Sequence, residues 1–316
     1  MSLNLPEQFV ILIYPCIEGR NLLLHAVFFH EIGHLIDFKY EITENLFNTL
    51  ELDKTAVNEA LEKYKSIPVG QYKLTDLVSE SEIKSNLISE CTKILKEWLS
   101  EIVADFIAIR LIGPAFLFSL IQISIMSDVV QRDTETHPSS AYRLNCLIDE
   151  LNRLGYFKIE TFRPYLKRVK TFIESEKCQM KKRIEKTVEH VKYKVVIKTI
   201  SKAMKIIQTQ VDEVLRKLSI FARNDEKILN YLVDKRILRA IPPAEFKKLS
   251  QSNKKIASIQ EIINSGWITF LKRKKELFQL THAQSIEDQA ISFLVLNELL
   301  MKAVEASEIL ELWNKV

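Results

Sequence analysis

The chain has 316 residues, of which 47% are apolar and 27% are charged, and it contains only six glycines and eight prolines. A chain of this length and apolar content can bury the cores of two domains, which excludes a disordered protein. So few glycines and prolines leave little room for the many tight turns of a sandwich or barrel. We therefore expect a mainly α protein.

The cysteines and the N-terminus exclude some further classes. Cys16, Cys91, Cys146 and Cys178 are scattered singly, without a CxxC pair, which argues against a thiolate metal site and against a disulfide scaffold. We expect them to be core residues. The N-terminal apolar run lacks a basic leader and is short for the core of a signal peptide, so we expect a cytoplasmic protein.

The first elements in chain order are a strand and a helix. The apolar run FVILIY at residues 9–14 predicts a buried strand, closed by Pro15. A helix follows, which Asn21 can cap and which continues to about Asp37. This helix contains the sequence HEIGH at residues 30–34, flanked by uncharged residues, as is typical of a helix buried under an active site.

The middle of the chain predicts further helices. Helical periodicity at residues 52–67 ends in a loop signal, and residues 80–112 resemble one long helix that stops at Gly113 and Pro114. The longest uncharged run, residues 111–126, is shorter than the roughly twenty residues that a membrane span needs, so we expect a buried helix and no transmembrane span. Residues 141–155 predict an amphipathic helix that ends on Gly155.

From about residue 164 the pattern is that of a helical bundle or coiled coil, with apolar residues spaced by threes and fours. Residues 191–200 also alternate with period two, which leaves a break or a strand near residue 195 open. Residues 291–313 predict one more amphipathic helix. We therefore expect two domains, residues 1–160 with a minimal β element and a basic all-helical domain at residues 161–316.

The charge distribution is uneven. Residues 163–275 contain 29 Lys and Arg against 11 Asp and Glu, a net charge of +18, whereas the remainder has a net charge of −14. Such a basic region predicts an anionic partner, either nucleic acid, an acidic protein or the acidic N-terminal half of the chain itself. Aromatic residues are sparse between the basic ones, which weakens the case for stacking on single-stranded nucleic acid.

The HEIGH sequence predicts a metal site. Residues four apart lie on one face of a helix, so His30 and His34 would direct their imidazoles at a common point, with Glu31 beside them. Zinc binds two neutral imidazoles readily, and manganese or iron stay possible at such a site. Gly33 costs a helix about 1 kcal/mol relative to alanine, so we expect another segment to pack closely against it.

A third ligand should come from another element. Glu101 and Asp105 lie one turn apart in a very apolar segment, where buried carboxylates need partners such as a metal ion. Asp105 could accept a hydrogen bond from the ring N–H of a ligand histidine. Glu97 is an alternative ligand, whereas His25, roughly 140° from His30 around the helix, is expected to be a packing residue.

The motifs resemble a known group of enzymes. HEIGH followed by EIVAD at residues 101–105 resembles the gluzincin pattern of thermolysin-like peptidases, and HPSSAYR at residues 137–143 resembles an element of the HtpX-like and CAAX-prenyl-endoprotease metallopeptidases. The resemblance implies a zincin-like domain with zinc ligands His30, His34 and Glu101, Glu31 as general base, Asp105 in support and His137 near the oxyanion. It covers residues 27–147 only.

The resemblance has departures. Members of that group carry membrane spans, which we do not expect here, and Ser100 stands where thermolysin-like enzymes often have asparagine. Arg143 could bridge to an acidic helix or touch substrate. We expect a zinc-dependent metalloendopeptidase acting on a peptide or protein substrate. The alternative is a helical adaptor with a structural or inactive metal site that binds an anionic partner through residues 163–275.

Overall fold

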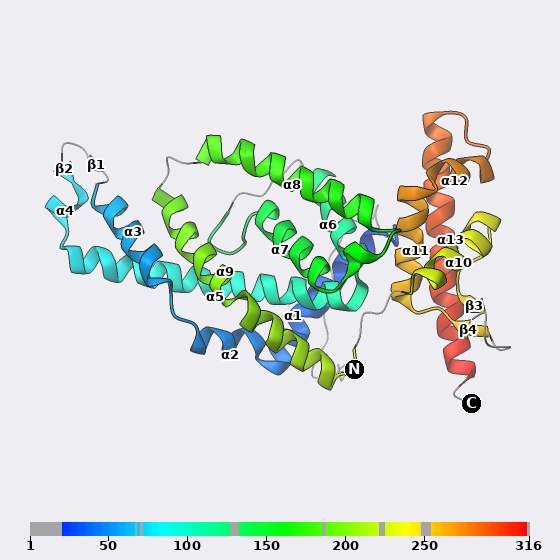
Figure 1. The fold of residues 1–316 in the computed structure, drawn as a ribbon, viewed down its shortest axis with the longest axis horizontal. Helices are drawn as coiled ribbons and strands as arrows, with labels where there is room; N and C mark the ends of the chain where they lie inside the picture. The colour runs from blue at the N-terminus through cyan, green and yellow to red at the C-terminus, as the bar shows by residue number, and fades with distance from the viewer. Residues whose placement is uncertain are drawn as a thin grey trace, which may run out of the picture. The chain divides into compact units, whose positions relative to one another are not determined.

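The computed structural model describes residues 21–66, 68–69, 72–126, 133–184, 188–220, 225–247 and 254–314. These residues are mainly helical, which confirms the expected fold class (Figure 1). The strand predicted at residues 9–14 lies outside the described residues. Within them, no helix is both long enough and apolar enough to cross a membrane.

The chain divides into two compact units, one of residues 32–223 and one that joins residues 1–31 to residues 224–316. The division falls inside the first α-helix, α1 (Phe28–Tyr40), which continues without a break across it. The boundary predicted near residue 160 falls inside the larger unit. The change in charge along the sequence therefore does not coincide with the division between compact units.

The larger unit contains a series of helices and one short hairpin. In chain order these are α2 (Ile42–Thr49), α3 (Lys54–Lys65), β1 (Pro68–Val69), β2 (Tyr72–Lys73), α4 (Leu74–Leu77), α5 (Glu80–Ile112), α6 (Pro114–Met126), α7 (Ser140–Arg153), η3 (Tyr156–Lys158), α8 (Arg163–Ile184) and α9 (Val188–Lys217). The strands β1 and β2 pair antiparallel where the sequence predicted a loop.

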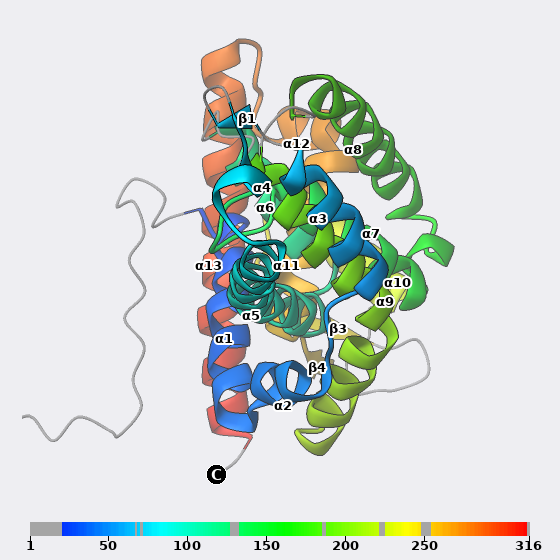
Figure 2. The same ribbon diagram turned by 90° about the vertical axis from the view of Figure 1, so that its left-hand side faces the viewer.

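The long helix α5 is the centre of the larger unit, and its ends are those that the sequence predicts. Ser79 caps its start by accepting a hydrogen bond from the backbone N–H of Glu82 at 3.3 Å. Gly113 ends it with a φ of 71°, a conformation that costs glycine no steric clash, and Pro114 begins α6. Figure 2 shows α5 end-on with α2, α3 and α9 around it.

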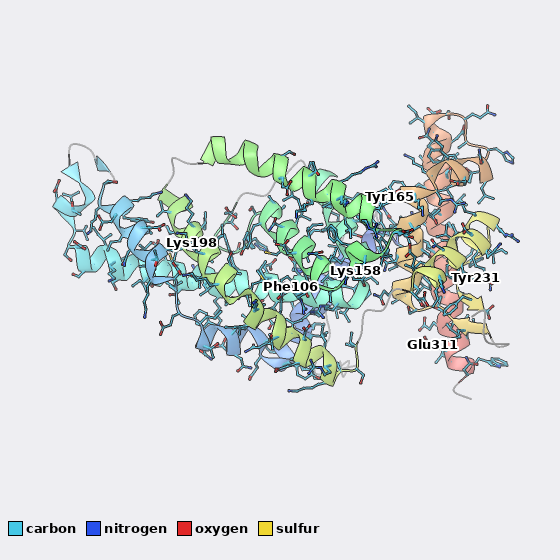
Figure 3. All side chains as sticks on the ribbon, in the orientation of Figure 1. Phe106, Lys158, Tyr165, Lys198, Tyr231 and Glu311 are labelled. Carbon is cyan, nitrogen blue, oxygen red and sulfur yellow. The ribbon has the colours of Figure 1, made fainter. Side chains whose placement is uncertain are left out.

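The core between α5 and α9 is aromatic and aliphatic. Trp98 of α5 stacks on Tyr193 of α9 with ring centroids 5.5 Å apart, and Phe106, labelled in Figure 3, is fully buried. Val195 and Val196 are fully buried within α9, so a helix and not a strand passes through residue 195. Cys91 and Cys146 are buried as predicted, and the side chains of the other two cysteines lie outside the described part.

A buried ion network ties α5, α7 and α9 together. Glu150 of α7 is fully buried and accepts hydrogen bonds from Arg110 at 2.8 Å, from Arg153 at 2.8 and 2.9 Å and from Gln208 at 2.8 Å. Asp212 of α9 forms an ion pair with Arg153, whose Nη1 atom lies 3.0 Å from Asp212 Oδ2. Burial raises the pKa of Glu150 above its ordinary value, while Arg110 opposes that rise.

The smaller unit packs an N-terminal turn against C-terminal helices. Its elements are η2 (Leu24–Val27), α10 (Glu226–Lys235), η4 (Ile237–Arg239), β3 (Glu245–Lys247), β4 (Lys254–Ile256), α11 (Ile259–Lys272), α12 (Lys274–Leu280) and α13 (Ile286–Trp313). Leu23 is fully buried; its carbonyl accepts from Trp267 Nε1 at 3.3 Å and its N–H donates to Asn297 Oδ1 at 3.3 Å. The first α-helix begins at Phe28, later than the Asn21 cap predicts, because η2 precedes it.

Candidate metal centre

The site is built where α1 crosses α5 at very short range. Gly33 of α1 faces the backbone of Ala104 on α5, and a Cβ at Gly33 would lie 2.5 Å from the Ala104 carbonyl oxygen and 2.8 Å from its Cα. Only a residue without a side chain allows the two helix backbones to approach so closely. This confirms the prediction that another segment packs against Gly33.

This crossing brings three potential metal ligands together. His30 and His34, one turn apart on α1, meet Glu101 of α5, and one donor atom from each lies within 4.8 Å of the others. The Nε2 atom of His34 is 3.3 Å from Glu101 Oε1. Zinc bonds of about 2.0–2.2 Å in a tetrahedron place two donor atoms about 3.4 Å apart, so the His34 and Glu101 donors fit that ion.

The other ring nitrogen of His34 faces side chains that the sequence analysis did not single out as partners. Its Nδ1 atom lies 3.2 Å from Ser100 Oγ, which also donates to Asp37 Oδ2 at 3.4 Å. Asp37 is buried and accepts two further hydrogen bonds, both of 2.7 Å, from the backbone N–H and the hydroxyl of Thr43. Burial raises the pKa of Asp37, against the bonds from Thr43 that lower it.

A second carboxylate supports Glu101 through an arginine. Arg143 of α7 is buried and donates to both oxygens of the fully buried Asp105, at 2.8 and 2.6 Å. Its Nη1 atom lies 3.1 Å from Glu101 Oε2. Arg143 therefore bridges from α7 to two carboxylates of α5, which is one of the two roles expected for it. The predicted hydrogen bond from a ligand histidine to Asp105 stays a prediction.

The loop before α7 brings His137 to the edge of the site. Its Nε2 atom is 3.7 Å from Glu101 Oε1, and the side chain is exposed. The loop is fixed to α5 because Trp98 Nε1 donates to the Thr134 carbonyl at 2.9 Å, and Thr134 exchanges hydrogen bonds with His137. His137 does not belong to the group of three donors. Its place near the oxyanion stays a prediction.

Glu31 lies on α1 between the two histidines in sequence, and its side chain is exposed. The residues around it differ from the expectation of a buried helix, because Ile32 is 37% exposed, Leu35 is 42% exposed and Phe38 is 78% exposed. The helix is therefore buried on the side of Gly33 and open on the side of Glu31.

The alternatives to these residues occupy other positions. Glu97 is exposed and stands outside the group of three donors, so the structure brings Glu101 and not Glu97 to the histidines. His25 packs on the ring of Phe28 with centroids 5.1 Å apart, which confirms its prediction as a packing residue.

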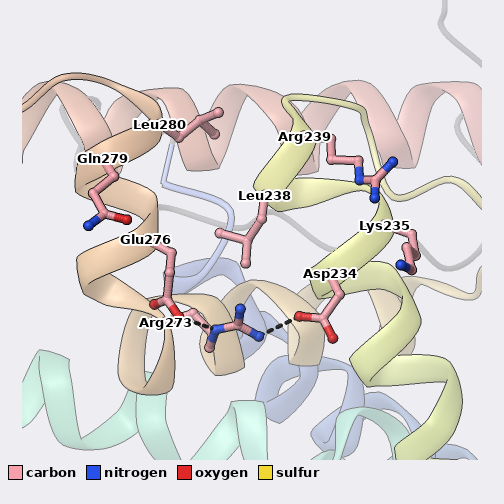
Figure 4. Close-up of a pocket in the computed structure, with 8 residues that line it drawn as sticks. All are labelled: Asp234, Lys235, Leu238, Arg239, Arg273, Glu276, Gln279 and Leu280. Carbon is pink, nitrogen blue, oxygen red and sulfur yellow. Dashed lines mark hydrogen bonds and ion pairs between the residues drawn. The ribbon is translucent and has the colours of Figure 1, made fainter.

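A pocket in the smaller unit lacks such chemistry. Figure 4 shows it between α10, η4 and α12, lined by charged and aliphatic side chains and the amide of Gln279, without histidine or cysteine. Arg273 lies between Asp234 and Glu276 and donates to Glu276 at 2.7 Å, so its charge is neutralised within the pocket. The pocket therefore offers neither a metal-ligand set nor a free cation from Arg273.

Some basic residues of the region 163–275 form ion pairs with acidic residues elsewhere in the same chain. On α9, Lys192 pairs with Glu90 at 2.6 Å, Lys198 (labelled in Figure 3) with Glu59 at 2.7 Å, and Lys202 with Asp53. These contacts agree with the alternative in which the basic half meets the acidic half of the same chain. On α8, Lys167 and Lys170 are exposed, and no described acidic group lies within ion-pair distance of them. An external anionic partner of residues 163–275 stays a prediction.

Comparisons with models of protein families, with curated proteins and with solved structures found no match. The residues and geometry of the site therefore carry the functional interpretation.

Proposed function

We propose that the protein is a zinc-dependent metalloendopeptidase with its active site at the crossing of α1 and α5. The observation that carries the proposal is the meeting of His30 and His34 with Glu101, which stands 67 residues further along the chain than His34. Two imidazoles and one carboxylate are a common ligand set of catalytic zinc. A divalent ion held there would polarise a scissile carbonyl and acidify a water molecule.

Each nearby side chain has a task in this proposal. Glu31 is the general base: its exposed carboxylate takes a proton from the attacking water and delivers it to the leaving amine. His137 donates a hydrogen bond to the oxyanion from the edge of the site. Arg143 and Asp105 hold Glu101 in place, because Arg143 contacts both carboxylates.

The alternative is a helical adaptor with a structural metal. A structural zinc is closed by a fourth protein ligand, whereas a catalytic zinc keeps an open position. Among the residues that the structure describes, the group has three potential ligands, and the exposed face of α1 lies beside them. Both observations support the catalytic proposal over the structural one.

The test is peptide cleavage by zinc-loaded protein. Wild type and Glu31→Gln are loaded with one equivalent of zinc and incubated with a mixed peptide library, and the products are read by mass spectrometry. We expect cleavage by wild type and none by Glu31→Gln, although both hold zinc. Zinc-loaded wild type that leaves every peptide intact would refute the peptidase and favour the adaptor.

A further inference from the structure

Helix α13 has apolar side chains on two opposite sides. One side packs against the rest of the smaller unit, where Leu296, Leu300 and Ala303 are fully buried. The other side is apolar as well, but it is open. Of the fifteen large apolar side chains exposed in the described part of the chain, six belong to this helix: Ile286, Ile291, Leu294, Ile309, Leu312 and Trp313. Because a helix that is apolar all round is normally covered all round, we expect a partner on the open side.

Four of these exposed residues lie in line along the helix. Ile291 and Ile309 are 18 residues apart, as are Leu294 and Leu312, and 18 residues complete five turns of an α-helix. Each pair therefore lies on one side of α13, with about 27 Å between its two members at 1.5 Å per residue. All four are between 52% and 63% exposed. The open side thus has two separate apolar ends, which only an elongated partner can cover together.

Acidic side chains lie between the two apolar ends. Glu298 and Glu305 are exposed on the same side of α13, with exposed Lys302 about one turn from each. Glu308 and Glu311 add two exposed carboxylates near the C-terminal apolar end. In the part of the chain that the structure describes, neither Glu298 nor Glu305 is held by an ion pair. The open side is therefore acidic in the middle and apolar at both ends.

The charges argue against a second copy of α13 as the partner. In an antiparallel pair, the register that matches Leu294 with Ile309 also sets Glu298 opposite Glu305, once on each side of the two-fold axis. A parallel pair sets each glutamate opposite its own copy. Like charges across an interface reduce affinity, and two copies of Lys302 cannot neutralise four carboxylates. An anionic membrane surface or a nucleic acid is repelled for the same reason, whereas a basic helix suits both features.

We propose that this side of α13 is a docking surface for a basic amphipathic helix of another protein. Apolar side chains of that helix pack on the two apolar ends, and its lysines or arginines meet Glu298 and Glu305. A helix that reaches from Ile291 to Leu312 needs about 22 residues. The docking surface contains no residue of the candidate metal centre, so it is a property separate from the proposed peptidase activity.

Trp313 gives a local signal for binding at this surface. It is 79% exposed, whereas the other two tryptophans, Trp98 and Trp267, are buried, so acrylamide quenches mainly the fluorescence of Trp313. The probes are two synthetic 22-residue helical peptides without tryptophan that share the same apolar residues. One carries lysines and the other glutamates at the central positions. We expect the lysine peptide to protect Trp313 from acrylamide and to bind at least about 10-fold more tightly than the glutamate peptide.

Three variants test the surface itself. Ile309→Ser should weaken binding of the lysine peptide about 10-fold, because truncating one central apolar contact commonly costs that much. Ile206→Ser, at an exposed isoleucine of α9, is the matched control and should leave binding unchanged. The double variant Glu298→Lys with Glu305→Lys should reverse the preference, so that the glutamate peptide binds more tightly.

The proposal has two outcomes that would overturn it. The first is equal binding of both peptides to wild type, or binding of the lysine peptide that Ile309→Ser leaves unchanged. The second is a wild-type dimer, detected by light scattering, that Ile309→Ser converts to a monomer. That result would assign this side of α13 to a second copy of the chain.

Discussion

Replacing Gly33 by alanine separates two opposite expectations. Helix propensity alone favours Gly33→Ala by about 1 kcal/mol, because alanine loses less backbone entropy in a helix. The structure predicts the reverse, since the new Cβ would lie 2.5 Å from the Ala104 carbonyl oxygen, and an ordinary carbon–oxygen contact is about 3.3 Å. The atoms in the way are backbone, so α1 and α5 must separate by about 0.8 Å.

Overpacking of this kind costs about 1–3 kcal/mol, and backbone obstruction places Gly33→Ala in the upper half of that range. After the gain in propensity, we expect a net loss of about 1–2 kcal/mol in the free energy of unfolding, measured by urea denaturation of the metal-free protein. Zinc affinity should fall as well, because His30 and His34 move with α1 away from Glu101. Ser89→Ala on the exposed face of α5 supplies the control for propensity alone. A Gly33→Ala protein as stable as wild type, with unchanged zinc affinity, would refute the close crossing of the two helices.

Three further predictions concern the buried side chains of Glu150, Arg143 and Cys91. Glu150→Ala removes the buried carboxylate that accepts from Arg110, Arg153 and Gln208, while both arginines keep Asp212, and should cost about 1–3 kcal/mol in urea denaturation. Asp149→Ala at an exposed neighbouring position should change stability by less than about 0.5 kcal/mol. Arg143→Lys loses the two-point contact with Asp105 and should weaken zinc binding about 10-fold or more in competition with a chelator of known affinity; equal affinity would show that Glu101 needs no support. Burial raises the pKa of the Cys91 thiol to about 12. In a variant with alanine at the other three cysteines, the Cys91 thiol of the native protein should therefore react slowly with a thiol reagent at pH 8, and about tenfold faster for each pH unit up to pH 10. Fast reaction at pH 8 would contradict this burial.

Much of the larger unit could be predicted from local chemistry. The ends of α5 follow from Ser79 at the start and from Gly113 and Pro114 at the end, which act within one turn of the chain. The ambiguous segment near residue 195 could not be settled locally, because its valines fit a helix face and a strand equally. Tertiary burial against α5 decided for the helix.

The site was predicted as far as its residues repeat a known spacing. The pairing of His30 with His34 on one helix face follows from helical geometry. The close packing of another segment against Gly33 was predicted because glycine is unfavourable in a helix interior. The partners of His34 were missed because Ser100 and Asp37 are 63 residues apart and act only after α1 meets α5. The one available signal was the position of Ser100 directly before Glu101 in the sequence.

The division of the chain could not be predicted from composition. The change in net charge near residue 160 reflects only where basic side chains occur along the sequence. The compact units are instead defined by contacts between distant segments, such as the hydrogen bond between Leu23 and Asn297. Lysines of α9 face acids of α3 and α5 within one unit, so opposite charges in the two halves of the sequence here mark elements that pack together.

The central claim is that Glu101 completes a metal site with the two histidines of α1. The most direct test is zinc stoichiometry by mass spectrometry on purified, zinc-equilibrated wild type, Glu101→Ala and Glu97→Ala, the last being a carboxylate one turn away on the same helix. We predict about one zinc per chain in wild type and Glu97→Ala, and loss of zinc in Glu101→Ala. Zinc retained in Glu101→Ala but lost in Glu97→Ala, or absent from wild type, would contradict the site.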